Sequence, residues 1–388
     1  MRLPDLPVPN EVEERSLRVV REAFAARVPN PSRRTAKRSV WLVIAAAVVA
    51  ASAISAVAVS ASGSSVLNTV RDALGVRNAA PVLTRLPTAG RLLVNSSNGP
   101  WIVRADGAKR HLGGAAYAHA SWSPHGLFEV VVLHGRELAA IDPKGNVRWS
   151  LARGQVSDAR WSEDGYRIAY RSGTTLRVVA GDGTGDHLLA RGTDAAPAAW
   201  NGASHQIAYA DLHGRVHLVN ADTRAAAWTS KAGPLPTQIA WEPGGRQVVA
   251  LARGTLRVLH ARDGSLFKQI ALPPGSHQLA ISPTGPAAVT TQSARGQSSI
   301  LLLHPQHPWL APRPVFRGAG RFNSVVWSPD GRWLLASWAS ADQWVFIKLG
   351  IRSGAIEHVQ AVSSIAPAFG SKAAPSFGGW CCPAAGPP

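Results

Sequence analysis

Two histidines and a tryptophan share one proline-rich segment, and they are the first residues to consider for chemistry. His304, His307 and Trp309 lie within residues 304–312. Two imidazoles three residues apart can bind one metal ion, but a stable metal site needs three or four protein ligands. No other His, Cys, Asp or Glu lies close to them in the sequence. We therefore predict no metal site here and treat the three residues as a candidate ligand-binding loop, with an ordinary surface loop as the alternative.

The only two cysteines are neighbours, Cys381 and Cys382. Adjacent thiols cannot connect distant parts of a fold, and the sequence contains no CxxC motif or metal-ligand spacing. The pair therefore forms a vicinal disulfide, remains as two free thiols, or packs as two small residues near the chain end. We favour the packing role, and the sequence does not determine the redox state.

Familiar catalytic motifs are absent from the sequence. There is no GxSxG elbow, no HExxH pair and no phosphate-binding loop. The glycine-rich segment 181–186 lies between two expected strands and opens no helix, so it does not fit nucleotide binding. The 13 histidines are scattered. We predict a protein that is not an enzyme, with no catalytic residue, metal or cofactor.

A repeated turn is the strongest organising signal in the chain. Trp122-Ser123-Pro124-His125-Gly126 recurs at steps of 39, 39, 41, 40 and 46 residues, best preserved as Trp327-Ser328-Pro329-Asp330-Gly331. The first residues of the copies, to which we add a tryptophan near the C-terminus, are the landmark residues Trp122, Trp161, Trp200, Trp241, Ile281, Trp327 and Trp380. A repeat of about 40 residues is typical of a propeller or a solenoid.

Each copy is followed by further short strand signals. Apolar runs at 167–170 and 176–179 follow one copy, and a turn such as Asp182-Gly183 leads to a fourth short strand. Four short strands in each repeat correspond to one propeller blade. Proline sets φ in these turns, Ser or Asp accepts a local hydrogen bond, and Gly takes the positive φ. We assign the turn Asp residues to this structural role rather than to catalysis or metal binding.

These turns resemble those of the WD40-like β-propellers of the TolB type, over residues about 91–382. The resemblance implies an all-β propeller but says little of function, because such propellers serve as binding platforms and as accessory domains of peptidases. Six blades start near the landmarks from Trp122 to Trp327. We predict that the strand 377–380, with Trp380, completes the strand pieces at 91–113 and closes a seven-bladed ring; six blades are the alternative.

An uncharged segment of about 22 residues precedes the propeller. Residues 39–61 contain no charge, match the thickness of a bilayer at about 1.5 Å per residue and start beside Trp41. Arg33, Arg34, Lys37 and Arg38 lie just before them, which places the N-terminus in the cytoplasm. We predict a single transmembrane helix rather than a cleaved signal peptide or a buried core helix.

The segments that flank this span have their own patterns. Residues 1–38 form a basic cytoplasmic segment with an amphipathic helix over 10–27, which lies on lipid headgroups or docks a cytoplasmic partner. Residues 62–90 contain a short juxtamembrane helix that ends at Gly75, then a linker. Residues 91–388 form the propeller outside the cytoplasm.

The charge balance indicates the kind of partner. Residues 1–38 hold nine Lys/Arg against five Asp/Glu, whereas residues 62–388 hold 32 against 18, a net charge of +14. This excess attracts anions, but no basic run with interleaved aromatics exists, so we predict no nucleic-acid binding.

We expect a membrane-tethered binding, sensing or scaffold module for proteins or anionic envelope polymers, of undetermined oligomeric state. The alternative is a propeller hydrolase or lactonase that uses the central funnel. The inner-strand ends offer mostly Ala, Trp and Ser, which favours the binding module; three or more Asp, Glu or His on the axis would favour the enzyme.

Overall fold

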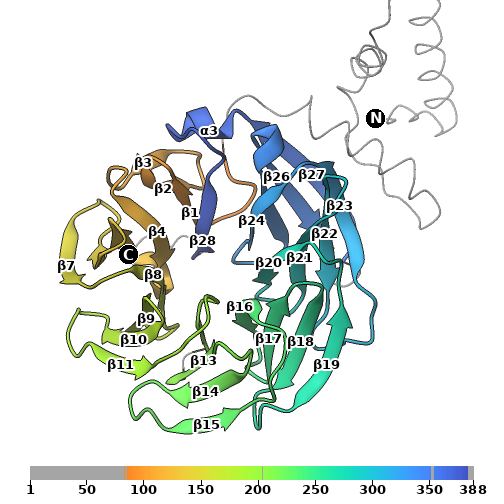
Figure 1. Ribbon diagram of the computed structural model, residues 1–388. Coiled ribbons are helices and arrows are strands. Elements are labelled where there is room, and N and C mark those ends of the chain that lie inside the picture. The colour runs from red at the N-terminus through yellow and green to blue at the C-terminus, as the bar shows by residue number, and fades with distance from the viewer. Residues whose placement is uncertain (1–82, 84, 203, 351–353, 383–388) are drawn as a thin grey trace, which may run out of the picture. The chain divides into compact units, whose positions relative to one another are not determined.

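Seven four-stranded antiparallel sheets form the structure, a computed structural model that describes residues 83, 85–202, 204–350 and 354–382. The sheets are arranged in a ring as the blades of a propeller (Figure 1), and the side of each sheet nearest the ring's axis is called the channel side. The predicted all-β fold is confirmed, with seven blades rather than six. The described residues add only two 3₁₀ turns, η1 (Pro124–Gly126) and η2 (Ala339–Ala341), and the one-turn helix α3 (Ile365–Ala368).

The blades are numbered in chain order, and each has four strands from the channel to the rim. The innermost strands of blades 1 to 7 are β28 (Ser376–Cys381), β4 (Tyr117–Trp122), β8 (Val156–Trp161), β12 (Ala199–Trp200), β16 (Pro236–Trp241), β20 (Ser276–Ile281) and β24 (Phe322–Trp327). The second strands are β1 (Arg91–Ser96), β5 (Glu129–Leu133), β9 (Arg167–Ser172), β13 (Gln206–Ala210), β17 (Gln247–Ala252), β21 (Ala287–Gln292) and β25 (Trp333–Trp338).

The outer half of each blade completes the sheet. The third strands are β2 (Gly99–Arg104), β6 (Glu137–Ile141), β10 (Thr175–Ala180), β14 (Val216–Asn220), β18 (Thr255–His260), β22 (Gln297–Leu303) and β26 (Gln343–Leu349). The outermost strands are β3 (Lys109–His111), β7 (Val147–Ala152), β11 (His187–Ala190), β15 (Ala226–Thr229), β19 (Leu266–Ala271), β23 (Arg313–Ala319) and β27 (Ile356–Ser363).

The ring closes by pairing the two ends of the propeller sequence. Strand β28 lies antiparallel to β1, with Leu92 opposite Trp380 and Val94 opposite Phe377. This confirms the predicted closing strand. Closure gives β1 a partner on its channel side, so the inner edge of β1 is paired and blade 1 has four strands like the other blades.

The landmark residues end or nearly end the innermost strands, and four of their indoles connect blades. The indole N–H groups of Trp122, Trp200, Trp241 and Trp327 donate to Gly379 O (3.2 Å), Arg160 O (3.1 Å), Ala199 O (3.0 Å) and Ala280 O (3.1 Å) in the preceding blades. Ile281 has no donor to offer. The buried indole nitrogens of Trp161 and Trp380 have no partner among the described residues.

The apolar core lies between the blades. Every residue of β17 is buried, whereas most of the outermost strand β19 is at least partly exposed. One buried cluster joins Val130 and Leu138 of blade 2 to Trp161 and Ile168 of blade 3. Each blade therefore buries its apolar faces against its neighbours, and the ring holds together through these contacts.

The predicted membrane span 39–61 and the predicted helices before and after it lie outside the described residues. Within the described part of the chain, no helix is long and apolar enough to cross a membrane. The span remains a prediction from the sequence.

Candidate functional site

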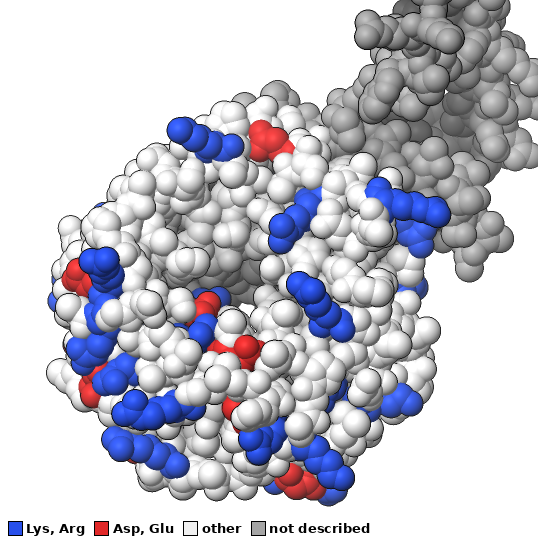
Figure 2. Space-filling view, viewed as in Figure 1, with Lys and Arg blue, Asp and Glu red and all other residues white. Residues whose placement is uncertain are grey.

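A polar cavity of about 300 Å³ lies at the channel, lined by residues from five blades. Its lining includes His119 of blade 2, Asp158 and Arg160 of blade 3, Gln278 of blade 6 and Asn323 of blade 7. Cavities of this size and polarity suit small hydrophilic groups. Figure 2 shows that one face of the ring is hollowed at its centre, with Lys and Arg scattered around the ring and a few acidic groups near the hollow.

One repeated position supplies much of the lining. His119, Asp158, Gln278, Ser324 and Phe377 each lie three residues before the landmark residue of their blade. The expectation of mostly Ala, Trp and Ser at the inner-strand ends misses these residues, because the cavity is formed nearer the strand starts. Aligning the repeats on the landmark and reading back three residues would have found them.

His119 and Asp158 are held by β-bulges in adjacent blades. The register of β4 shifts between Ala118 and Ser121, and that of β8 shifts between Ser157 and Arg160. His119 has φ 53° and Asp158 has φ 56°, values that residues with a side chain rarely adopt. Bulges redirect side chains, and non-glycine residues with positive φ concentrate at functional sites.

Neighbouring side chains fix the two bulges. Asn95 of blade 1 makes two hydrogen bonds to the backbone of Ala120. Its Nδ2 donates to Ala120 O (3.1 Å), and Ala120 N donates to its Oδ1 (2.8 Å), which stabilises the β4 bulge. In β8, Asp158 Oδ2 accepts from Ser157 Oγ at 2.7 Å and lies 3.5 Å from Arg171 Nη1. The carboxylate of Asp158 is therefore partly committed to structure.

Several lining groups keep unused hydrogen-bonding capacity. Asn323 Nδ2 donates to Ala374 O (3.1 Å), but its buried Oδ1 has no partner among the described residues. Gln278 Oε1 accepts from Gln238 Nε2 (3.3 Å), and the Gln278 amide nitrogen donates no hydrogen bond to the described residues. Arg160 Nη1 donates to Ala159 O (2.9 Å), and this is the only hydrogen bond that the Arg160 side chain makes with the described residues. A bound molecule can satisfy these groups, and Asn323 Oδ1 has the most to gain, because a buried polar atom without a partner is costly.

The cavity offers few groups for acid–base chemistry. Asp158 and His119 are the only Asp, Glu or His in its described lining, below the three that would favour an enzyme. Across the described residues, no group of three or more His, Cys, Asp or Glu is placed to hold a metal ion. The arrangement is suited to binding a polar group more than to transferring protons.

The turn acids have the structural role expected of them. Asp330 Oδ1 accepts from Arg332 N (3.0 Å), and Ser328 Oγ accepts from Trp333 N (2.9 Å), while Gly331 has φ 66°. Partial burial opposes the charged form of Asp330, but hydrogen bonds from Ser328 Oγ, Arg332 N and Thr88 Oγ1 hold its pKa below the ordinary value.

The candidate loop with His304, His307 and Trp309 does not reach the cavity. It connects β22 to β23, the two outer strands of blade 6. Trp309 is 68% exposed, and its ring centre lies 5.1 Å from that of His307. Partial burial, together with His307 and Arg313, lowers the pKa of His304. Ligand binding by this loop remains a prediction, separate from the channel.

A second, more open groove of about 690 Å³ lies between the linker and blade 7. Arg85, Arg332, Lys348 and His358 contribute to its lining. Lys348 pairs with Glu357 at 2.8 Å, so part of this positive charge is already compensated. The groove adds to the basic surface, but none of its described lining residues has a buried polar atom without a partner, as Asn323 has in the channel.

Comparison with known proteins supports the fold. No protein-family model matches the chain, and no curated protein matches it. Among solved structures, it is similar to a putative 6-phosphogluconolactonase from Bacteroides uniformis, at 15% identity and TM-score 0.53, over 71% of this chain and 97% of that one. It is also similar to the C-terminal WD40 domain of Sif2, at 13% identity and TM-score 0.53, over 74% and 90% of the two chains. A chain of the mitotic checkpoint complex matches at 18% identity and TM-score 0.53, over 66% and 86%. At these identities the likeness concerns the fold alone: the chain is a seven-bladed β-propeller structurally like WD40 and lactonase propellers.

Proposed function

We propose that this protein is a non-enzymatic binding or sensing module, tethered outside a membrane by residues 39–61 and engaging its partner at the channel cavity. The partner is a protein or an anionic envelope polymer. A small-molecule cofactor has no part in this function.

The observation that carries the proposal is the unused hydrogen-bonding capacity of Arg160, Gln278 and Asn323 around one polar cavity. An anionic group can accept from the Arg160 guanidinium and the Gln278 amide, and a hydroxyl or amide N–H can donate to Asn323 Oδ1. The net charge of +14 on residues 62–388 increases the local concentration of anionic partners.

The proposed location rests on the sequence of residues 33–61 and has one further support. Cys381 and Cys382 form a disulfide, and disulfides persist mainly in oxidising compartments outside the cytoplasm. A propeller placed outside the membrane meets that condition.

The test is binding by the full-length protein, purified in detergent and immobilised. A polyuronate, a poly(glycerol phosphate) and an extract of envelope proteins are passed over it at low and at physiological salt. We expect at least one to bind with a salt dependence weaker than that of free polylysine, because the cavity contacts are not purely electrostatic. If none of the three binds at physiological salt, the proposed function is wrong.

The alternative function, a propeller hydrolase or lactonase, has one specific observation in its favour. His119, Asp158 and Arg160 meet in one cavity, and the first two have positive φ. Base-assisted attack of water on a lactone would use His119, with Arg160 stabilising the oxyanion. Lactone opening, followed as acid release in a pH-stat with glucono-δ-lactone, tests it: a rate above background that His119→Ala abolishes would replace the binding role.

A further inference from the structure

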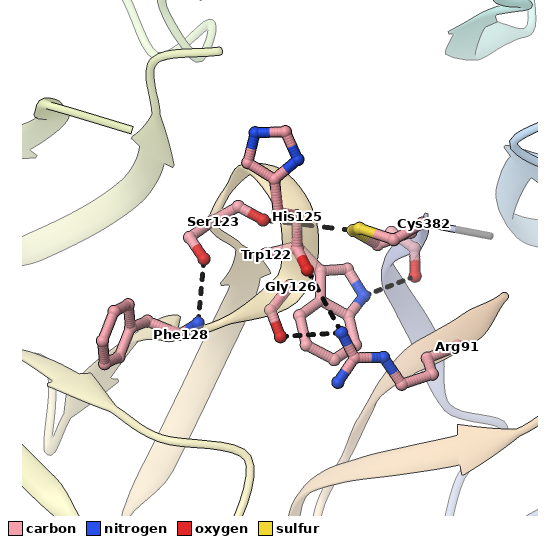
Figure 3. The surroundings of a disulfide bond; sticks show 9 residues. Arg91, Trp122, Ser123, His125, Gly126, Phe128 and Cys382 are labelled. Atoms are coloured by element: carbon pink, nitrogen blue, oxygen red, sulfur yellow. Dashed lines mark hydrogen bonds between the residues drawn. A yellow bond between two sulfur atoms is a disulfide. The ribbon is translucent and has the colours of Figure 1, made fainter. Parts of the chain in front are cut away.

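The seam between blades 1 and 2 contains the only two cysteines of the chain. Cys381 is the last residue of β28 and lies opposite Arg91 of β1. Its sulfur is bonded to that of Cys382. Figure 3 shows this disulfide beside the turn Ser123–Gly126 of blade 2, which carries the landmark Trp122.

This disulfide cannot act as a conventional staple. A disulfide stabilises a fold mainly by restricting the unfolded chain, and the effect grows with the length of the closed loop. Cys381 and Cys382 are adjacent, so their bond restricts almost no chain. The ring is already closed by the main-chain pairing of β28 with β1. The reactivity of the bond, rather than cross-linking, is therefore the property to explain.

The guanidinium of Arg91 lies beside the disulfide in a fixed position. Arg91 Nη2 donates to Gly126 O (2.8 Å) and His125 O (3.3 Å), and the guanidinium carbon lies 5.0 Å from the centre of the Trp122 ring. Cys381 Sγ lies 4.0 Å from Ser123 O. Residues directly opposite each other in an antiparallel pair have neighbouring side chains on one face of the sheet. Arg91 is thus the cation next to Cys381.

No carboxylate among the described residues pairs with Arg91 in the structure. Arg91 acts electrostatically on Glu129, which is fully buried and whose two carboxyl oxygens have no hydrogen-bond partner among the described residues. Burial raises the pKa of Glu129 to about 8, against the opposing effect of Arg91. Burial therefore favours the neutral form of Glu129, and within the described part of the chain this carboxyl makes no ion pair with Arg91.

We propose that Cys381–Cys382 is a thiol–disulfide exchange site for a dithiol reductant, with Arg91 stabilising the thiolate of Cys381 as the leaving group. The dithiol's first thiolate attacks Cys382 Sγ, the bond between the two cysteines breaks, and Cys381 leaves as a thiolate beside Arg91. The dithiol's second thiolate then attacks the dithiol sulfur that is bonded to Cys382. That bond breaks, and Cys382 is released as a thiolate. Two electrons and two protons pass from the dithiol to the cysteine pair, and the dithiol ends as a disulfide.

This order of attack follows from the surroundings of the two sulfurs. Exchange is faster when the leaving thiolate is stabilised, and a neighbouring cation stabilises a thiolate. Arg91 lies opposite Cys381, whereas Cys382 follows the end of β28. Both cysteines are partly exposed, so a small thiol can reach them.

The test uses the oxidised full-length protein with dithiothreitol as the dithiol. Reduction is stopped by acid, free thiols are alkylated, and the C-terminal peptide is weighed by mass spectrometry. We expect no alkylation before reduction and two alkylated cysteines after it. Arg91→Gln should slow reduction at least threefold, Arg91→Lys should restore most of the rate, and Arg104→Gln, which removes an exposed arginine of the adjacent strand, should leave the rate unchanged.

A second measurement needs no variant and decides the matter if Arg91→Gln does not fold. Glutathione, a monothiol, is used to trap the mixed disulfide, and fragmentation locates the adduct. We expect it on Cys382, with Cys381 alkylated. An adduct mainly on Cys381, alkylation of both cysteines without reductant, or a folded Arg91→Gln protein that is reduced at the wild-type rate would overturn the proposal.

Discussion

His119 in blade 2 and Asp158 in blade 3 occupy the same structural position. Each lies three residues before its landmark tryptophan, in a β-bulge and with a positive φ, and each lines the channel cavity. No other described innermost strand places a non-glycine residue at this position with positive φ. Two neighbouring blades therefore hold a strained conformation that brings polar side chains to one place.

Relief of this backbone strain is the first prediction. A left-handed conformation costs a residue with a Cβ about 1–2 kcal/mol, which glycine avoids. We expect His119→Gly to have a free energy of unfolding about 1 kcal/mol above that of His119→Ala, measured by urea denaturation. The same two changes at Gln278, where φ is not positive, give the control: there glycine should be the less stable. An alanine variant of His119 as stable as the glycine variant would argue against strain.

The second prediction concerns the buried carboxyl of Glu129. Its pKa is about 8 in the folded protein against an ordinary value of 4.5, mainly because of burial. Between these values the folded state binds more protons than the unfolded state, so stability falls as pH rises through this window and stays low above it. Glu129→Gln should remove much of this slope and raise stability at pH 9 by several kcal/mol relative to the parent. Thermal unfolding between pH 5 and pH 9 measures it; parallel pH profiles for parent and variant would contradict it.

The third prediction separates two kinds of landmark tryptophan. The indole of Trp327 donates to Ala280 O, whereas that of Trp161 is buried without a described partner. The Trp327–Ala280 bond is partly buried, and an intramolecular hydrogen bond of this kind contributes about 0.5–1.5 kcal/mol net. The Trp161 indole N–H makes no such contribution. We expect Trp327→Phe to lose about 1 kcal/mol more stability than Trp161→Phe in chemical denaturation. Equal losses would mean that the inter-blade bond contributes little.

The fourth prediction concerns the closing strand. Truncation before Ser376 removes β28 and exposes the channel edge of β1, so cooperative unfolding should be lost and the protein should aggregate. Truncation after Cys382 keeps every described strand and is the control. Thermal unfolding and size-exclusion chromatography distinguish the two, and a monomeric, cooperatively folded protein without β28 would show that closure is dispensable.

The repeats predict the fold well because each landmark reports a physical constraint. A landmark residue, which is tryptophan in every blade except the sixth, ends or nearly ends each innermost strand, and four of these indoles bond to the preceding blade. The landmarks from Trp122 to Trp327 therefore locate six blades, and Trp380 locates the seventh. The cavity is harder to predict. Asp158 and Arg160 lie on a strand whose alternation is broken by a bulge, and their convergence with Gln278 and Asn323 depends on the curvature of the whole ring. The loop with His304 was predicted as a ligand-binding loop from its residue types alone, and it connects the two outer strands of blade 6.

The most direct test of binding at the channel compares two arginine variants of the full-length protein. For each variant, the dissociation constant is measured with the polymer or protein that the parent binds. Arg160→Gln removes the charge in the cavity, and Arg317→Gln removes the same charge from the exposed outermost strand β23. Binding at the cavity predicts at least a tenfold weaker affinity for Arg160→Gln and less than a twofold change for Arg317→Gln, at physiological salt. Equal, small effects of the two changes would contradict a site in the channel and assign binding to the diffuse positive surface.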